Sequence, residues 1–326
     1  MRRAFFSVIS AALAMSGCGG NSSDGAPASP PPPPAASLTI TATNAKPAAR
    51  VAYGATMESI DTGGLVGDTG IGGSNDGGFQ KPGAPAPIPG LLSAALQKVP
   101  LGPDTYDCGV SGTQTISGDL ANPLTLSVGD QINVDAADCD DGLGEVINGR
   151  MEMTVAAFSG DLFSGMYLLE MDVMLIDFEV VTATDTVLSN GDSTVMVNTT
   201  GAPTVLMSIS GTSMTTVSTM SSVTMTNFLT AQSVDTSVVP EPYTLDSSGT
   251  VDSSAIGGVI AYTTPVTFQG MGAAYPFAGQ LLITGAGGAT IRLIALDATN
   301  VRIETDTDGD GTVDSTEETT WDDIAQ

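Results

Sequence analysis

The sequence predicts an all-β protein, an antiparallel meander of roughly 12–15 strands in a curved sheet, a barrel-like or sandwich domain, with one or two short N-terminal helices. From Tyr106 onward, apolar residues alternate with Thr, Ser and Asp, which is the period of a strand. Glycine-containing turns interrupt this alternation at short intervals. Connections such as residues 128–131 and 190–192 are too short for crossover helices, so neighbouring strands should pair antiparallel.

Residues 1–17 have the order of a secretion signal: Arg2 and Arg3 come first, an apolar run follows over residues 4–15, and small residues precede Cys18. The stretch MSGC at residues 15–18 resembles the lipobox of bacterial lipoproteins. The resemblance implies that Cys18 is lipidated and becomes the first residue of the mature chain. Gly19, in the place where Asp would retain the protein in the inner membrane, favours the outer membrane. The alternative is an ordinary cleavable signal with an incidental cysteine.

Three further regions follow the signal. Residues 18–37, with the lipidated cysteine at their start, are rich in Pro, Gly and Ser, as expected of a tether that need not pack. Residues 38–104 are expected to hold a short strand (LTITATNA), a short helix with Pro47 at its first position, a Gly- and Pro-rich loop over residues 61–90, and a helical turn or two over residues 91–99. Residues 105–326 are expected to form the all-β domain.

The all-β region contains about fifteen candidate strands, separated by turn residues. They are residues 114–116, 124–128, 131–136, 149–158, 168–182, 193–198, 204–209, 213–225, 228–234, 243–251, 255–268, 279–284, 290–296, 301–305 and 316–321. Within residues 168–182 the apolar positions change parity near Met174 and Leu175. This change predicts a β-bulge, or a strand that passes from one sheet to another.

Composition excludes several classes of function. The chain has 9 basic and 36 acidic residues, a net charge of −27 and no histidine. Without clusters of Lys and Arg, nucleic acid is excluded as a partner. Without histidine, the Ser-His-Asp and Cys-His nucleophile systems and imidazole metal sites are excluded too. A hydrolase built on paired carboxylates, such as a glycosidase, stays open as an alternative, with Asp172, Asp177 or Glu179 as candidates.

The three cysteines divide between lipid and disulfide. With Cys18 assigned to the lipid, Cys108 and Cys139 are left in an oxidising compartment, and we expect them to form a disulfide. Closing a loop of about thirty residues would remove roughly 3–4 kcal/mol of unfolded-state entropy.

The segment DTDGDGTVDSTE, residues 306–317, has the ligand spacing of a calcium loop. Calcium takes six to eight hard oxygens, and such a loop supplies them from positions 1, 3, 5, 7, 9 and 12, with Gly at position 6. These positions hold Asp306, Asp308, Asp310, Thr312 through its carbonyl, Asp314 and Glu317, with Gly311 at the bend.

This segment resembles the loop of an EF-hand, but its flanks do not. An EF-hand has a helix on each side, whereas residues 301–304 and 319–321 alternate like strands, so whether Glu317 reaches the ion stays open. The alternative is a hairpin whose Asp-Gly turns need no metal. If calcium binds, we expect a structural role, because no nearby base points to catalysis.

Two other patterns carry weaker predictions. Asp135, Asp138, Asp140, Asp141 and Glu145 form either a weak cation site or a solvated acidic loop. The stretch LLITGAGGATIRL from residue 281 imitates a dinucleotide-binding turn, but the alternation that follows it predicts a glycine-rich hairpin instead of a helix.

These observations together predict an outer-membrane-anchored lipoprotein that faces the periplasm or the cell surface. Its all-β domain would be a non-enzymatic structural or binding module of the cell envelope with a structural calcium site. Its partner would be an envelope or surface component that the sequence does not identify. The alternative is a carboxylate-based hydrolase such as a glycosidase.

Overall fold

The structure is a computed structural model. It describes residues 37–67, 102–121, 126–140, 142, 144–161 and 165–325, without the side chains of residues 61–67. The described residues belong to one compact unit, Ala35–Gln326. The predicted signal, the predicted lipidation site Cys18, the predicted tether up to residue 36, residues 68–90 of the predicted loop and the predicted helical turn over residues 91–99 lie outside the described residues.

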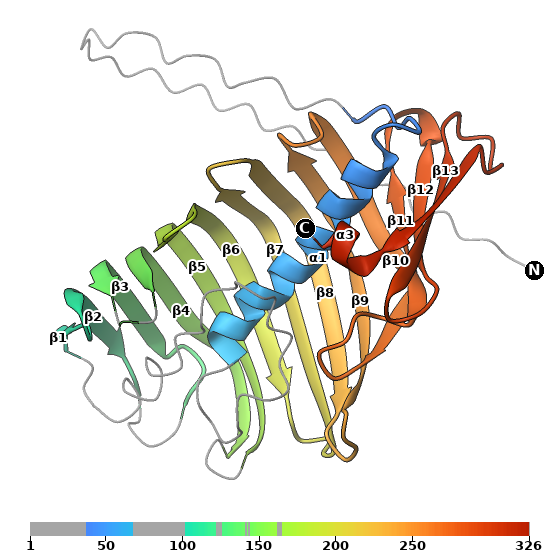
Figure 1. Cartoon of the computed structure of the whole chain (residues 1–326). Coiled ribbons are helices and arrows are strands. Elements are labelled where there is room, and N and C mark those ends of the chain that lie inside the picture. Colours follow the sequence, from blue (N-terminus) through green and yellow to red (C-terminus); the bar gives the residue numbers. More distant parts are fainter. Residues whose placement is uncertain are drawn as a thin grey trace, which may run out of the picture. The chain divides into compact units, whose positions relative to one another are not determined.

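In the described part of the chain, fourteen antiparallel strands form a single sheet in which neighbours in sequence are neighbours in space (Figure 1). The strands are β1 (Asp104–Asp107), β2 (Ser111–Asp119), β3 (Gln131–Asp140), β4 (Glu145–Asp161), β5 (Met166–Thr182), β6 (Thr186–Asn198), β7 (Thr204–Val217), β8 (Ser222–Asp235), β9 (Pro242–Ser253), β10 (Gly258–Met271), β11 (Ala278–Thr284), β12 (Thr290–Ala295), β13 (Asn300–Asp306) and β14 (Ser315–Thr320). The sheet is not closed, because β1 and β14 are its two edges. The predicted all-β meander is therefore confirmed.

Helix α1 (Ala45–Gly67) crosses one face of the sheet and contacts β6 to β13 (Figure 1). Its buried side is built largely of alanine, with Tyr53 and Ile60 as larger members, so the helix lies close to the strands. Pro47 falls in the first turn, where its missing N–H has no intrahelical partner to lose. The helix is longer than predicted: it includes residues 61–67, which were expected to be loop. Packing of one face against the sheet stabilises a helix beyond its local propensity.

The expected strand LTITATNA is wrong. Ser37 makes an isolated parallel bridge to Val259, and the N–H of Leu38 donates to the carbonyl of Val259 at 2.9 Å. The chain then turns at residues 42–44 and enters α1. We call residues 37–40 the N-terminal strap.

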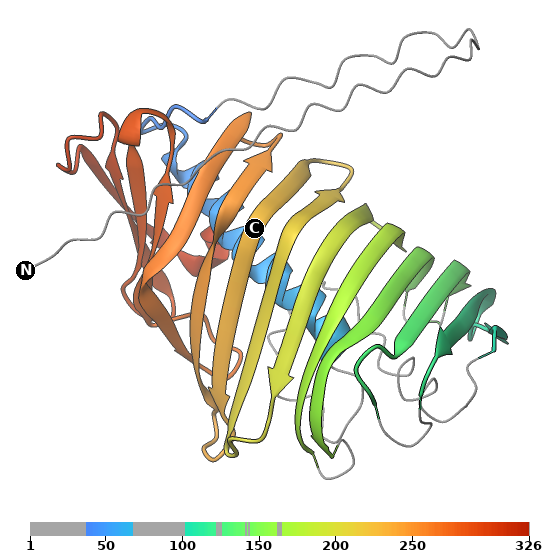
Figure 2. The ribbon, with the colours of Figure 1, turned by 180° about the vertical axis from the view of Figure 1, so that it is seen from behind.

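Both faces of the sheet follow the predicted alternation. On the face toward α1, side chains such as Met171, Ile209 and Val251 are fully buried. Figure 2 shows the other face, with α1 visible behind the strands. Polar cross-strand pairs occur on that face, for example the Thr194 hydroxyl that donates to Asp172 at 2.7 Å.

The C-terminal helix α3 (Trp321–Ile324) buries the single tryptophan against α1 and the sheet. The Trp321 ring lies 4.9 Å from that of Tyr53 and 6.0 Å from that of Phe268, measured between centroids. Its indole N–H is shared between the carbonyls of Pro276 at 3.0 Å and Asp297 at 3.1 Å. The end of the chain is thus anchored in the core beside α1.

A line of β-bulges crosses the middle of the sheet. In β5 the pairing with β6 shifts between Leu175 and Phe178, and Asp177 has a left-handed φ of 47°. The predicted change of parity in this strand is therefore confirmed as a bulge. Neighbouring strands carry left-handed residues at the same level: Asp138 in β3, Gly149 in β4, Gly191 in β6 and Asn227 in β8.

The predicted connection at residues 190–192 is wrong, because these residues lie inside β6. The Asn190 side chain accepts a hydrogen bond from the N–H of Asp177 at 2.7 Å, and Asn148 accepts one from Asp138 in the same way. An Asn-Gly pair supplies left-handed φ both to a tight hairpin turn and to a bulge. For the same reason the candidate strand 193–198 is only part of β6. The candidate strand 204–209 is likewise only the first part of β7, which continues to Val217.

The disulfide Cys108–Cys139 joins the segment between β1 and β2 to β3, with the two Cα atoms 5.4 Å apart. This confirms the predicted pairing and ties down the β1 edge of the sheet. Within the described part of the chain, no helix has the length and apolarity that crossing a membrane requires.

Candidate metal centre

The segment with calcium-loop spacing joins the last two strands of the sheet. The pairing of β13 with β14 ends at Thr305 and Ser315, and the backbone N–H of Asp314 donates to the carbonyl of Thr305 at 2.8 Å. The flanks are therefore strands, as the alternation predicted, except that β14 ends at Thr320 and Trp321 begins α3. The loop sits on a hairpin at the edge of the sheet.

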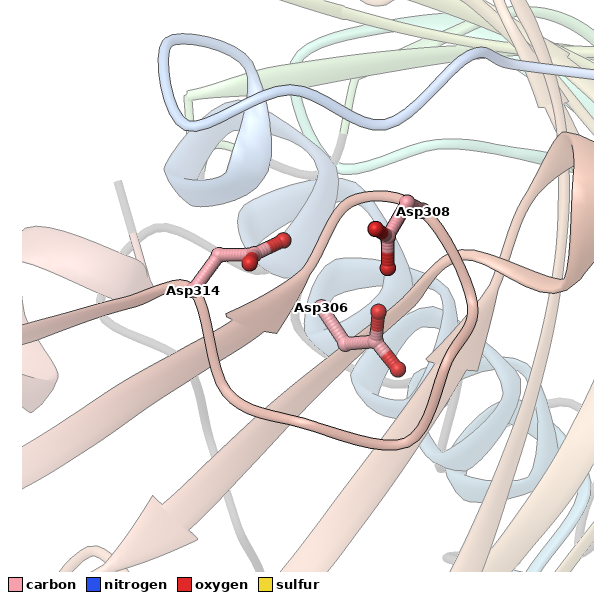
Figure 3. Close-up of side chains that lie close together, drawn as sticks. All are labelled: Asp306, Asp308 and Asp314. Atoms are coloured by element: carbon pink, nitrogen blue, oxygen red, sulfur yellow. The ribbon is translucent and has the colours of Figure 1, made fainter.

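Three aspartates of this loop converge. Asp306, Asp308 and Asp314 each offer a carboxylate oxygen, and these oxygens lie within 4.8 Å of one another. Figure 3 shows the three side chains directed into the loop from its two sides. Asp306 is buried, whereas Asp308 and Asp314 are exposed.

Backbone amides hold these carboxylates in place. Asp306 accepts hydrogen bonds from the N–H groups of Gly309 and Gly311, both at 2.8 Å. Both glycines have left-handed φ values, 75° and 88°, which turn the backbone around the Asp306 carboxylate. Across the loop, Asp314 accepts from the N–H of Thr307 at 2.8 Å and from its hydroxyl at 2.5 Å.

The arrangement suits a hard divalent cation. An ionised carboxylate has about four lone-pair sites, so oxygens that already accept one N–H bond can still coordinate a metal. Three such groups in a small space supply negative charge and hard oxygens, which calcium and magnesium prefer. The hydroxyl and N–H of Thr307 lower the pKa of Asp314, so this side chain is a carboxylate at neutral pH.

Asp310 does not belong to the converging group. Its carboxylate accepts the N–H of Thr312 at 2.7 Å and the hydroxyl of Thr312 at 2.5 Å, which together lower the pKa of Asp310. Asp310 and the predicted ligand residue Thr312 thus form a turn with each other.

Glu317 also lies outside the group. It is opposite Ile303 in the β13–β14 pairing, and its carboxylate lies 3.2 Å from the ammonium of Lys46 on α1. It lines a small recess with Ala42 and Ala45 at the start of α1. The hairpin therefore directs Glu317 toward α1, whereas the carboxylates of Asp306, Asp308 and Asp314 meet in the loop.

Sequence reasoning missed a cluster of charges beside this hairpin. The carboxylate of Asp323 on α3 is paired with both Lys46 and Arg50, the latter at 2.5 Å, and accepts the hydroxyl of Thr319 at 2.6 Å. Lys46 and then Thr319 lower the pKa of Asp323 to about 2. The spacing of Lys46 and Arg50, one helical turn apart in a chain with few basic residues, is the signal that would have pointed to this cluster.

The second acidic cluster has local partners. Asp135 pairs with Arg150 at 2.6 Å, and Asp140 accepts the N–H of Gly142 at 2.8 Å. Asp141 lies outside the described residues. Neither contact brings two carboxylates of this cluster together around a common point.

The carboxylates considered for hydrolysis lie along β5, around the bulge. Asp172 accepts the hydroxyl of Thr194 at 2.7 Å, and Glu179 accepts the side-chain amide of Asn148 at 3.2 Å. Asp177 is the left-handed residue of the bulge, between them in sequence. Each of the two bonded carboxylates is thus held by a polar neighbour on an adjoining strand.

Comparison of the chain with models of protein families, with curated proteins and with solved structures found no match. The fold and the candidate site are therefore interpreted from their own geometry.

Proposed function

We propose that this protein binds a calcium ion between Asp306, Asp308 and Asp314, and that the ion has a structural role. The observation that carries the proposal is the convergence of these three carboxylates within 4.8 Å on one short hairpin loop. Carboxylates so close repel one another, and a bound divalent cation would offset that repulsion. Backbone carbonyls of the loop and water would complete the six to eight oxygens that calcium takes.

The place of the loop supports a structural role. It connects β13 to the edge strand β14, and β14 leads directly into α3 with the buried Trp321. An ion that holds the two ends of the loop together would stabilise this edge of the sheet, because it binds the folded loop and not the unfolded chain.

The proposal extends to the location and class of the protein. We infer an outer-membrane lipoprotein, anchored through Cys18 and facing the periplasm or the cell surface, because the residues before Cys18 resemble a lipobox. We further infer a non-enzymatic structural or binding module whose partner is a component of the envelope or surface. The absence of histidine from the chain supports this inference, since most hydrolase mechanisms need one.

Calorimetric titration of the purified, chelator-treated protein with calcium tests the cation site. We expect saturable binding, and a melting temperature that rises with calcium concentration. At a hundredfold excess over Kd, the ion would add about 2.7 kcal/mol to the free energy of unfolding. The melting temperature is measured from the fluorescence of Trp321, which reports unfolding because this side chain is fully buried in the core.

Two matched variants decide whether the binding belongs to this loop. Asp308→Asn removes one of the three converging charges and should abolish or strongly weaken the titration. Asp297→Asn is the control, because Asp297 also accepts backbone amides in an exposed hairpin turn, those of Thr299 and Asn300, both at 2.7 Å. Absence of a calcium titration in the wild-type protein, or equal loss in both variants, contradicts the proposed site.

The anchor is tested separately by mass spectrometry and fractionation of cells that produce the chain. We expect a lipid-modified N-terminus at Cys18 and recovery in the outer membrane. Cys18→Ser should abolish both. A mature protein that is unmodified and soluble would contradict the anchor and leave the cation site untouched.

A further inference from the structure

The N-terminal strap is held at two points of the sheet. The N–H of Leu38 donates to Val259 on β10 at 2.9 Å, and the carbonyl of Leu38 accepts the N–H of Ala286 at 2.8 Å. The side chains of Leu38 and Ile40 are buried, with 8% and 1% of their surfaces exposed. The strap is therefore an integral part of the core, although it contributes only an isolated bridge to the sheet.

The second holding point is the turn between β11 and β12. This turn contains a short 3₁₀ helix, η1 (Ala286–Gly288), and confirms the predicted glycine-rich hairpin. A side chain at Gly285 would come within 2.5 Å of the Leu38 carbonyl and 2.8 Å of the Ile40 side chain. Gly285 is required because the strap passes directly against its backbone, whereas Gly287 and Gly288 have left-handed φ values of 69° and 85°.

The other side of this turn lies against residues 306–314, the loop between β13 and β14, which we call the acidic loop. A Cβ atom at Gly309 would lie 2.8 Å from the carbonyl oxygen of Gly287 and 2.9 Å from the carbonyl carbon of Gly288. The N–H of Gly309 is in turn held by the carboxylate of Asp306. Acidic loop, glycine turn and strap thus form a continuous series of backbone contacts.

We propose that the acidic loop stabilises the position of the N-terminal strap through the β11–β12 turn. We call this arrangement the lock. Gly309 is the positioning residue, since it allows the two backbones to touch. In the proposed lipoprotein, the strap is where the tether enters the folded unit, so a pull on the anchor acts first on the bonds of Leu38. A loosened lock would free the strap and then the start of α1.

Hydrogen exchange at the amides of Leu38 and Ala286 in the full chain, measured in chelator, tests the lock. Gly309→Ala would drive a side chain into the turn, which should shift and weaken both bonds. We expect these two amides to exchange roughly tenfold faster than in the wild-type protein, because local opening becomes easier when their hydrogen bonds are weakened.

Gly311→Ala is the matched control. Gly311 has a similar left-handed φ in the same loop, 88° against 75°, but a side chain there would meet nothing within 4 Å. Both variants carry a similar backbone strain, and contact with the turn is what distinguishes them. Equal exchange rates at Leu38 and Ala286 in the two variants would overturn the lock.

A second variant covers the case in which Gly309→Ala does not fold. Asp306→Asn keeps the size of the side chain but weakens the acceptor for the N–H of Gly309. It should speed exchange at Leu38 and Ala286 in the same cation-free buffer. Unchanged rates would overturn the proposal.

Calcium provides a further readout, and this part rests on the proposed function. Calcium added to the wild-type protein should slow exchange at Leu38 and Ala286. If calorimetry detects binding in the loop but these amides are unaffected, the lock is overturned and the cation site stands. If calorimetry detects no binding, the cation site is overturned, and the comparison of Gly309→Ala with Gly311→Ala still decides the lock.

Discussion

Replacement of Glu317 tests whether this residue is a calcium ligand, as the last loop position of an EF-hand is. In an EF-hand the last loop position gives a bidentate carboxylate, and its loss would remove two oxygens from the ion. Here the carboxylate of Glu317 is 3.2 Å from Lys46, and its side chain is 51% exposed. We therefore expect Glu317→Gln to leave calcium affinity within about twofold of wild type, since it removes no ligand.

The expected effect on stability is also small. An exposed ion pair contributes roughly 0.2–1 kcal/mol. For a protein of this size, 1 kcal/mol shifts the melting temperature by about 2–4 °C. Glu317→Gln should therefore lower the melting temperature by about 4 °C at most. By contrast, Asp308→Asn should weaken calcium binding by at least roughly tenfold, because changes to groups that only support a ligand already cost 10–100-fold.

Glu318→Gln is the matched control for calorimetric titration. Glu318 is the next residue on β14, its side chain is 63% exposed, and it pairs with Arg302 at 3.3 Å. Both variants remove one negative charge from the same edge strand, so the general electrostatic effect on a cation is the same. If Glu317→Gln lost tenfold or more in affinity while Glu318→Gln kept it, Glu317 would reach the ion, and our assignment of its side chain to α1 would be refuted.

Two other predictions concern the charge cluster and the line of bulges. Because the pKa of Asp323 is about 2, below an unfolded value of about 3.9, its stabilising contribution is complete above about pH 4 and is lost as the pH falls toward 2. The difference in melting temperature between wild type and Asp323→Asn should accordingly close over that range; a difference that stays constant would show that the ion pairs do not stabilise the fold. In the sheet, Gly149→Ala would place a Cβ against the backbone carbonyl of Asp177, whereas Gly129→Ala, at a similar φ, meets open space. Urea unfolding should show a loss of roughly 1–3 kcal/mol for Gly129→Ala and a clearly larger one for Gly149→Ala; equal losses would mean that strand β4 relaxes around the added group.

The alternation of buried and exposed residues in each strand, and the point in β5 where it changes, could be predicted from the sequence because both depend only on neighbouring residues. Side chains in a strand alternate between two faces, so the buried face of β5 and its change at the bulge follow directly from the order of apolar residues. The hairpin of β11 and β12 was predicted in the same way, from the alternation after Gly288. The Cys108–Cys139 pair followed from the number of cysteines and the compartment.

Glycine and asparagine correctly predicted where the backbone is irregular, but not whether the irregularity is a turn or a β-bulge. Asn190 and Gly191 give the same left-handed preference whether the chain reverses or bulges, and only the adjoining strand decides. In the structure, Asp177 on β5 donates its N–H to Asn190, which keeps β6 running through the pair. Strand ends were therefore predicted less well than strands.

The candidate site shows the same division. The sequence by itself determined that the segment 306–317 carries acidic residues at calcium-loop spacing, and that strands flank it. Only the tertiary structure decided which carboxylates meet: Asp306, Asp308 and Asp314 converge, while Glu317 is directed to Lys46. The physical reason is that spacing fixes which residues share a loop, whereas the path of the hairpin and the position of α1, which lies far away in sequence, fix the direction of each side chain.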